Sequence, residues 1–242
     1  YAKTIARPSF KELSFAEIVD PISGRTFVGG MFRDADDVAG REYWNGNLVS
    51  SNIHNVDLRW EMFQKNGQMI SLSGFYKYFN KPIEIVQYAT QTGTFQPRNV
   101  GDGNVLGIEV EFRRNLESIS GYLKNFSISS NMSFTRSRIE LSLTEYYSRI
   151  ENARTGQKIS KYREMAGQSP WIINSGITYF GGERGFWADF EAGLYYNVQG
   201  KTLQYVGIAD RPDIYTLPFH SLNLTASKNI GKDKRTQIGI KI

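Results

Sequence analysis

Long segments of this chain alternate strictly between apolar and polar residues, and this pattern constrains the fold more than any other feature. In segment 55–63 the apolar positions are Val56, Leu58, Trp60 and Met62, and the charged positions between them are Asp57, Arg59 and Glu61. Successive side chains of a β-strand point to opposite faces, so the pattern predicts a strand with one apolar and one charged face. Segments 70–78, 106–113 and 126–134 alternate in the same way.

The length of the alternating segments favours a membrane barrel over a soluble sandwich. A soluble sandwich also alternates, but it rarely keeps large apolar and aromatic residues on one face for about ten residues. Strands of about 9–11 residues with an apolar outer face and a polar inner face are typical of outer-membrane β-barrels. We therefore predict an all-β fold, an antiparallel transmembrane β-barrel.

The predicted strands are joined by connections that alternate in length. Nine strands are predicted near residues 1–6, 53–65, 68–80, 104–114, 123–137, 169–181, 185–197, 218–229 and 235–242. The short connections lie near 65–67, 115–122, 181–184 and 231–235, and the long ones cover 7–52, 81–103, 138–168 and 198–217. Weak helical periodicity occurs in 9–19 and 143–152. Short periplasmic turns and long extracellular loops are the arrangement expected of a transmembrane barrel.

Composition narrows the function classes. The 242 residues include no cysteine, which excludes disulfides, thiolate metal sites and a cysteine nucleophile. The 29 Lys and Arg residues are scattered, which argues against a nucleic-acid surface. Aromatic residues make up 14% of the chain, which suits either aromatic girdles at two membrane interfaces or a carbohydrate-binding surface.

Ten polar residues are expected to face the lumen of such a barrel, where they would contact a plug or line a substrate path. They are Asp57, Arg59, Glu61, Glu109, Glu111, Arg113, Asn174, Asp189, Glu191 and Asn223. The alternative is a solvated sheet face with cross-strand charge pairs.

The same carboxylates do not predict catalysis. Glu109 and Glu111 lie side by side on one strand, as do Asp189 and Glu191, whereas glycoside hydrolysis needs two carboxylates that flank the scissile bond. Nothing in the sequence points to a Ser-His-Asp hydrolase. We predict that the chain is not an enzyme.

No metal or cofactor site is predicted either. The two histidines, His54 and His220, have no paired spacing and fall at strand ends next to loops. The acidic segment 34–37 lacks the spacing of a calcium loop and is interpreted as a solvated loop.

Two sets of aromatic residues are assigned by position. Membrane-interface positions near strand ends are predicted for Trp60, Tyr76, Tyr78, Trp171, Tyr179, Phe186 and Tyr196, because amphipathic rings favour the membrane boundary. Candidate ligand contacts on loops are Trp44, Tyr88, Phe95, Tyr146, Tyr147, Tyr162, Tyr205 and Tyr215. For each set, the alternative is that the rings only pack against neighbouring side chains.

Five phrases in order carry a family resemblance. They are RPSFKELS (7–14), NVDLRWE (55–61), ISLSGFYKYFNKPIE (70–84), GNVLGIEVEFRRNL (103–116) and GQSPWIINSGITY (167–179). Together they resemble successive strands of the C-terminal barrel portion of TonB-dependent receptors of the Bacteroidetes type. The resemblance implies part of a barrel of about 22 strands, integral to the outer membrane. It also implies a plug domain in the lumen and uptake of a scarce nutrient driven by the TonB complex.

The expected partners follow from this reading. We expect residues 1–242 to be one partial barrel domain embedded in a lipid bilayer, without the plug, the TonB-contacting region or the first half of the barrel. Segments 1–6 and 235–242 should pair with polypeptide outside this sequence, since open sheet edges are not tolerated in a bilayer. The nutrient class stays open between an oligosaccharide, a peptide and a metal chelate, and a surface lipoprotein partner stays open too. A passive barrel without a plug and a soluble β-sandwich that binds carbohydrate are the alternatives.

Overall fold

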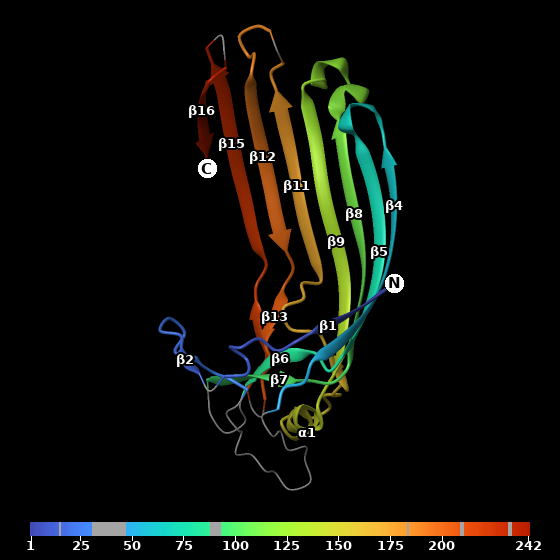
Figure 1. The fold of residues 1–242 in the computed structure, drawn as a ribbon, viewed down its shortest axis with the longest axis vertical. Coiled ribbons are helices and arrows are strands. Elements are labelled where there is room, and N and C mark those ends of the chain that lie inside the picture. Colours follow the sequence, from blue (N-terminus) through green and yellow to red (C-terminus); the bar gives the residue numbers. More distant parts are fainter. Residues whose placement is uncertain (15, 31–46, 88–92, 183, 209–210, 232–233) are drawn as a thin grey trace.

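One large antiparallel sheet dominates the computed structural model, which describes residues 1–14, 16–30, 47–87, 93–182, 184–208, 211–231 and 234–242. Its strands follow chain order: β1 (Ala2–Ala6), β4 (Ser51–Phe63), β5 (Met69–Asn80), β8 (Gly103–Asn115), β9 (Phe126–Glu140), β11 (Trp171–Phe180), β12 (Phe190–Gln199), β15 (Phe219–Ile230) and β16 (Thr236–Lys241). The two-residue strand β10 (Tyr162–Arg163) also pairs with β9. Figure 1 shows the long strands side by side. The prediction that the nine expected strands are antiparallel neighbours in chain order is confirmed, although further short strands are present.

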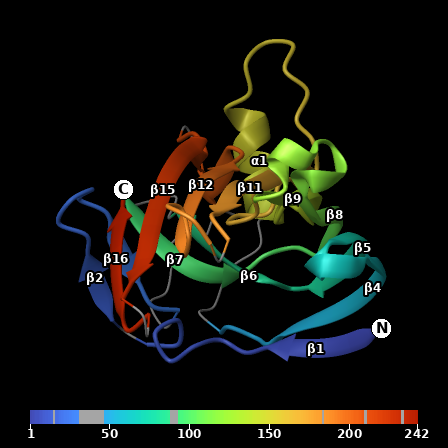
Figure 2. The ribbon, with the colours of Figure 1, turned by 90° about the horizontal axis from the view of Figure 1, so that it is seen from above.

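The large sheet is curved. Seen from above, its strands follow an arc, and a smaller sheet lies inside the arc (Figure 2). In the described part of the chain, β1 and β16 form the two edges of the sheet and pair only with β4 and β15. The sheet is therefore an open curved wall.

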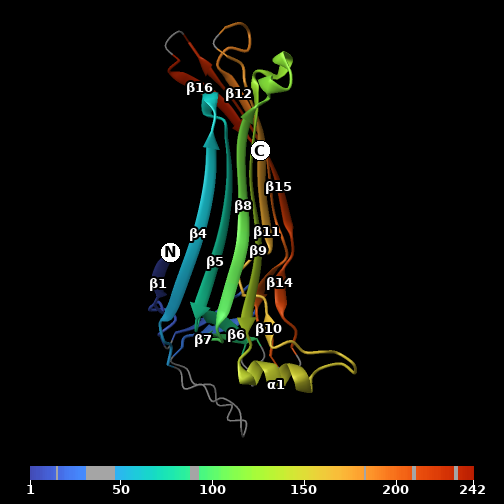
Figure 3. The ribbon, with the colours of Figure 1, turned by 90° about the vertical axis from the view of Figure 1, so that its right-hand side faces the viewer.

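The connections separate by length between the two ends of this wall (Figures 1 and 3). At the short-turn end lie the 3-10 turn η1 (Lys65–Gly67), the pair η2 (Leu116–Ser118) and η3 (Gly121–Leu123), and the described residues of two further connections, 181–182 with 184–189 and 231 with 234–235. Gly67 and Gly231 adopt positive φ in two of these turns, which glycine does without a steric penalty. The described parts of all four long connections lie at the opposite, long-loop end, as predicted.

The long connections contain short strands that the sequence did not predict. Four form a sheet in the order β2 (Glu17–Val19), β3 (Thr26–Val28), β7 (Thr94–Asn99) and β6 (Ile83–Gln87), and β13 (Thr202–Tyr205) pairs with β14 (Ile214–Thr216). The fully buried apolar side chains Phe95, Ile139, Leu203 and Val206 all lie at this end. The apolar core therefore lies at the long-loop end of the molecule, away from the centre of the wall.

The helix α1 (Leu143–Glu151) forms where helical periodicity was predicted. It begins at Ser142, whose hydroxyl accepts a hydrogen bond from the Glu145 N–H, and Glu145 places a negative charge in the first turn. Among the described residues, no helix has the length and apolar character needed to cross a bilayer.

Two predicted elements differ from the structure. The strand predicted over 185–197 begins only at Phe190, because 181–189 turns through Gly182, Gly185 and Asp189, all at positive φ. The helical turn expected in 9–19 covers only residues 10–13 and gives way to strand β2.

Candidate functional site

The register of the wall places the alternating residues on two opposite faces. The apolar face carries Leu58 on β4, Ile108 on β8, Leu222 on β15 and Ile240 on β16. Leu58, Leu222 and Ile240 have 79%, 65% and 61% of their surface exposed. An apolar face this large, left open in the described part of the chain, marks contact with lipid or with another protein.

The opposite, polar face carries an unbroken polar row across seven strands. Paired positions place Glu61, Ser71, Glu111, Asn131, Asn174, Asn197 and Ser221 at one level. Arg59 lies beside this polar row, with its Nε 2.6 Å from the Glu61 carboxylate and its Nη2 3.3 Å from the Glu111 carboxylate. Because the Arg59 side chain is 45% exposed, these pairs set the local charge pattern more than they stabilise the fold.

The polar face is the inner, concave one. Ile139 lies on this face of β9, an even number of positions from Asn131, and packs with Val86 of β6 and with Val100. Figure 2 shows β6 inside the arc. A cavity of ≈ 210 Å³ opens on the polar face beside Glu111, Asn174 and Asn197. The inner surface is thus polar and hollowed, while the outer surface is apolar.

Two aromatic side chains lie across glycines of the polar face, and the sequence analysis missed both. A Cβ on Gly176 or Gly193 would come within 2.7 Å and 2.6 Å of the Tyr195 ring. A Cβ on Gly107 would overlap the Phe75 ring in the same way. The signal was present in the sequence, since a glycine inside a strand often marks a close approach by another group.

Most residues predicted to face a lumen share the polar face. These are Asp57, Arg59, Glu61, Glu109, Glu111, Arg113, Asn174, Glu191 and Asn223. Asp189 differs, because it belongs to the turn before β12, where its carboxylate lies 2.7 Å from the Lys234 ammonium at the short-turn end.

The residues predicted for a membrane interface lie mainly on the apolar face. Register places Trp60, Tyr76, Tyr78, Trp171, Tyr179 and Tyr196 there. Phe186 instead belongs to the turn over 181–189, where it is exposed. Both histidines pair with tyrosine hydroxyls, His54 with Tyr1 and His220 with Tyr196.

The predicted loop aromatics are spread over several elements. Trp44 and Tyr88, like segment 34–37, fall outside the described residues. Tyr146 and Tyr147 lie on α1, Tyr162 on β10, Tyr205 on β13 and Tyr215 on β14. Phe95 and Tyr205 pack ring to ring at 4.9 Å, and the Lys201 ammonium lies 3.9 Å from the Tyr215 ring centre.

A buried charge network ties the long connections together. The Arg163 guanidinium lies 2.6 Å from Glu84 of β6 and 2.7 Å from Glu145 of α1. Arg149 extends the network from Glu145 at 3.0 Å to Asp213 at 2.9 Å. Burial alone would lower the pKa of Arg163, but attraction to Glu145 and Glu84 raises it above its ordinary value. The network therefore holds its arginine charged although the side chain is buried.

A second polar contact fixes the point where the wall meets the long connections. The Asp102 carboxylate accepts hydrogen bonds from the Tyr78 hydroxyl at 2.5 Å, the Asn80 amide at 3.0 Å and the Lys81 backbone N–H at 3.0 Å. Burial raises the pKa of Asp102, but these hydrogen bonds outweigh it and leave the pKa below its ordinary value.

The described residues contain no cluster of side chains suited to bind a metal ion. No group of three or more His, Cys, Asp or Glu side chains there is placed to hold a metal ion.

Known proteins match this architecture. Residues 1–241 match the family model described as TonB dependent receptor-like, beta-barrel. No curated protein matches the chain. Among solved structures, the copper transporter OprC is 15% identical, with a TM-score of 0.57 over 95% of this chain and 28% of that one. The siderophore receptor PirA from Pseudomonas aeruginosa is 15% identical, with a TM-score of 0.50 over 95% of this chain and 32% of that one. At these identities the likeness shows the fold alone, and the chain spans less than a third of either structure.

Proposed function

The chain belongs to the TonB-dependent receptor-like β-barrel family, and we propose that it is part of the barrel wall of a receptor that imports a scarce nutrient across the outer membrane. The polar row on the concave face is the observation that carries this proposal. An inner surface of hydroxyl, amide and carboxylate groups suits a hydrated path or a plug, and an apolar outer surface suits lipid.

The two free edges of the wall support a larger barrel. Unpaired strand edges cannot face hydrocarbon, because each unsatisfied backbone group costs several kcal/mol there. We propose that β1 and β16 pair with further strands of the same receptor, as expected for a partial barrel domain. The matched structures, each about three to four times as long as this chain, agree with that arrangement.

The proposed orientation places the long-loop end outside the cell and the short-turn end in the periplasm. A nutrient, or a surface lipoprotein that delivers it, would first meet the long-loop end with its aromatic residues. A plug domain would rest against the polar face and connect to the TonB complex. The Bacteroidetes type remains part of the proposal and rests on the five sequence phrases.

The nutrient is proposed to be a polar solute: an oligosaccharide, a peptide or a metal chelate. Asn131, Asn174 and Asn197 each offer both hydrogen-bond donors and acceptors at one level of the wall. The matched structures are a copper transporter and a siderophore receptor, which makes the metal chelate the first probe to use.

Uptake by cells that express the intact receptor tests the proposal. A radiolabelled ferric chelate, an oligosaccharide mixture and a peptide mixture serve as probes, each with and without a functional TonB complex. Accumulation of one probe only in the presence of TonB is expected. Equal accumulation without TonB would instead favour the passive barrel.

A matched pair of variants tests the role of the polar face. Asn174→Leu should reduce uptake severalfold at an unchanged surface level, because it removes hydrogen-bonding groups from the polar row. Asn104→Leu makes the same change on the opposite face, at the level of Tyr78 and Arg138, and should leave uptake unchanged. Equal effects of the two variants would contradict the assignment of faces.

A further inference from the structure

Two neighbouring arginines stand where the apolar face of the wall ends. On β9 the apolar face runs through Phe134 and continues with Arg136 and Arg138 at every second position. At the level of Arg138 the same face carries Lys3, His54, Tyr78 and Asn104 on the neighbouring strands. The outer surface thus changes from apolar to polar and basic at this level, on the long-loop side.

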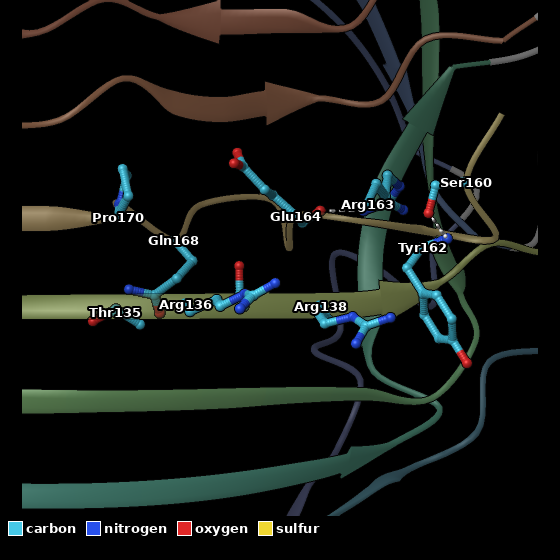
Figure 4. A pocket seen from close by; sticks show the side chains of 10 residues that line it. Thr135, Arg136, Arg138, Ser160, Tyr162, Arg163, Glu164, Gln168 and Pro170 are labelled. Atoms are coloured by element: carbon cyan, nitrogen blue, oxygen red, sulfur yellow. Dashed lines mark hydrogen bonds between the residues drawn. The ribbon is translucent and has the colours of Figure 1, made fainter. Parts of the chain in front are cut away.

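A gap in the wall opens beside these arginines. β9 pairs with β11 up to Phe134 and with β10 from Ile139, so residues 135–138 have no strand partner on that edge in the described part of the chain. A cavity of ≈ 490 Å³ occupies the gap, between this stretch of β9 and residues of the 160–170 connection (Figure 4). It is larger than the ≈ 210 Å³ cavity on the polar face.

Of the three arginines that line this cavity, Arg163 is paired with Glu84 and Glu145, whereas Arg136 and Arg138 have no anionic partner among the described residues. The Arg136 side chain makes no hydrogen bond or ion pair with the residues that the structure describes. The Arg138 guanidinium lies 4.3 Å from the centre of the Tyr162 ring, which orients it without neutralising it. Glu164 also lines the cavity, but in Figure 4 its side chain extends away from β9. Two adjacent positive charges are therefore free to meet an anion.

We propose that Arg136 and Arg138 bind the phosphate of a membrane lipid headgroup in the leaflet on the long-loop side, with the cavity receiving part of that headgroup. Guanidinium groups match phosphate oxygens with paired hydrogen bonds. The source is a lipid because the arginines directly continue the apolar face, so lipid headgroups would lie beside them once that face contacts hydrocarbon. This proposal rests on the proposed membrane orientation.

The cavity also indicates the kind of headgroup. Besides the arginines it presents the hydroxyls of Ser160 and Tyr162 and the amide of Gln168, and Figure 4 shows Gln168 extending toward β9. Neutral donors and acceptors of this kind suit sugar hydroxyls. A phosphorylated glycolipid fits both features, whereas a small phospholipid headgroup would use the arginines alone.

Lipid binding to the intact receptor in detergent tests the proposal. Native mass spectrometry would count bound molecules of a phosphorylated glycolipid, its dephosphorylated form, phosphatidylglycerol and inorganic phosphate. The double variant Arg136→Gln and Arg138→Gln should bind the phosphorylated glycolipid about thirtyfold more weakly, as expected for two basic contacts at an anionic membrane surface. The control is Arg114→Gln with Lys124→Gln, which removes two charges at the short-turn end and should bind as the unaltered receptor does.

Each outcome decides a separate point. Equal binding of the dephosphorylated glycolipid, or equal loss in both double variants, would overturn the phosphate assignment. Saturation by inorganic phosphate at the glycolipid's own concentration would overturn the lipid source, and preference for phosphatidylglycerol would overturn the glycolipid. Flotation of the receptor with liposomes is a separate readout: failure to float would refute the proposed membrane function, whereas flotation without glycolipid binding would refute only this inference.

Discussion

Replacement of Arg163 by methionine should release the long connections from one another. The side chains of Arg163, Glu84 and Glu145 are 6%, 4% and 2% exposed, so water cannot replace the lost partner. Removal of one member of a buried ion pair costs about 3–5 kcal/mol, because the remaining charges stay buried without compensation. Arg163→Met leaves the Glu84 carboxylate without a cation, whereas Glu145 keeps Arg149 at 3.0 Å, and we expect a loss in this range for the local stability of the long-loop end.

Hydrogen exchange of the intact receptor measures that loss locally. Peptides from α1 and β6 should exchange on the order of a hundredfold faster or more, since about 1.4 kcal/mol corresponds to a factor of ten. Peptides from the centre of β9 should not change and serve as an internal reference. Arg59→Met is the matched control, because it removes the same group from an exposed pair and should have little effect.

A compensated variant separates charge burial from lost packing. Glu84→Gln together with Arg163→Met removes the orphaned charge but keeps a similar volume, and should recover at least half of the lost stability. The reasoning is refuted if this double variant exchanges faster than Arg163→Met alone. Equal acceleration by Arg59→Met and Arg163→Met would refute it as well.

Three further substitutions test the two faces of the wall, the glycine packed against an aromatic ring and the hydrogen bonds to Asp102. Ile108→Arg should cost about 2–4 kcal/mol in a folding titration in lipid, while Glu109→Arg on the opposite face should cost much less. Gly107→Ala should cost about 1–3 kcal/mol because its Cβ meets a ring, whereas Gly74→Ala meets nothing within 4 Å and should be neutral in the same titration. The contribution of Asp102 should be present above the unfolded pKa of about 3.9 and be lost as the pH falls through its lower folded pKa, so thermal melts of Asp102→Asn should show a weaker acid dependence.

The long strands could be predicted from the sequence because one rule acts along their whole length. A wall with one apolar face and one polar face requires a period of two along each strand, and β9 shows it from Phe126 to Phe134 with Ser130 as the exception. The turn over 181–189 was partly misread as strand, since its start depends on three residues at positive φ that alternation cannot reveal.

The long-loop end could not be predicted in the same way. The strands β6 and β7 have five and six residues, too few for a clear period, and Pro97 within β7 argues against a strand by composition alone. Their side chains are buried by partners from other connections. The network around Arg163 could not be predicted for the same reason. Glu84 and Glu145 become neighbours of Arg163 only when separate connections fold together.

The central claim is that one face of the wall contacts lipid while the other lines a water-filled interior. Because this chain contains no cysteine, a spin-label scan along β9 in an otherwise cysteine-free intact receptor in liposomes tests the claim directly. Labels at Ile128 and Met132 should be accessible to oxygen dissolved in the bilayer, and labels at Ser129 and Ser133 to a water-soluble nickel chelate. A strict two-residue alternation between these two accessibilities is the predicted result. Equal accessibility to the nickel chelate at all four positions, or the reverse alternation, would contradict the account.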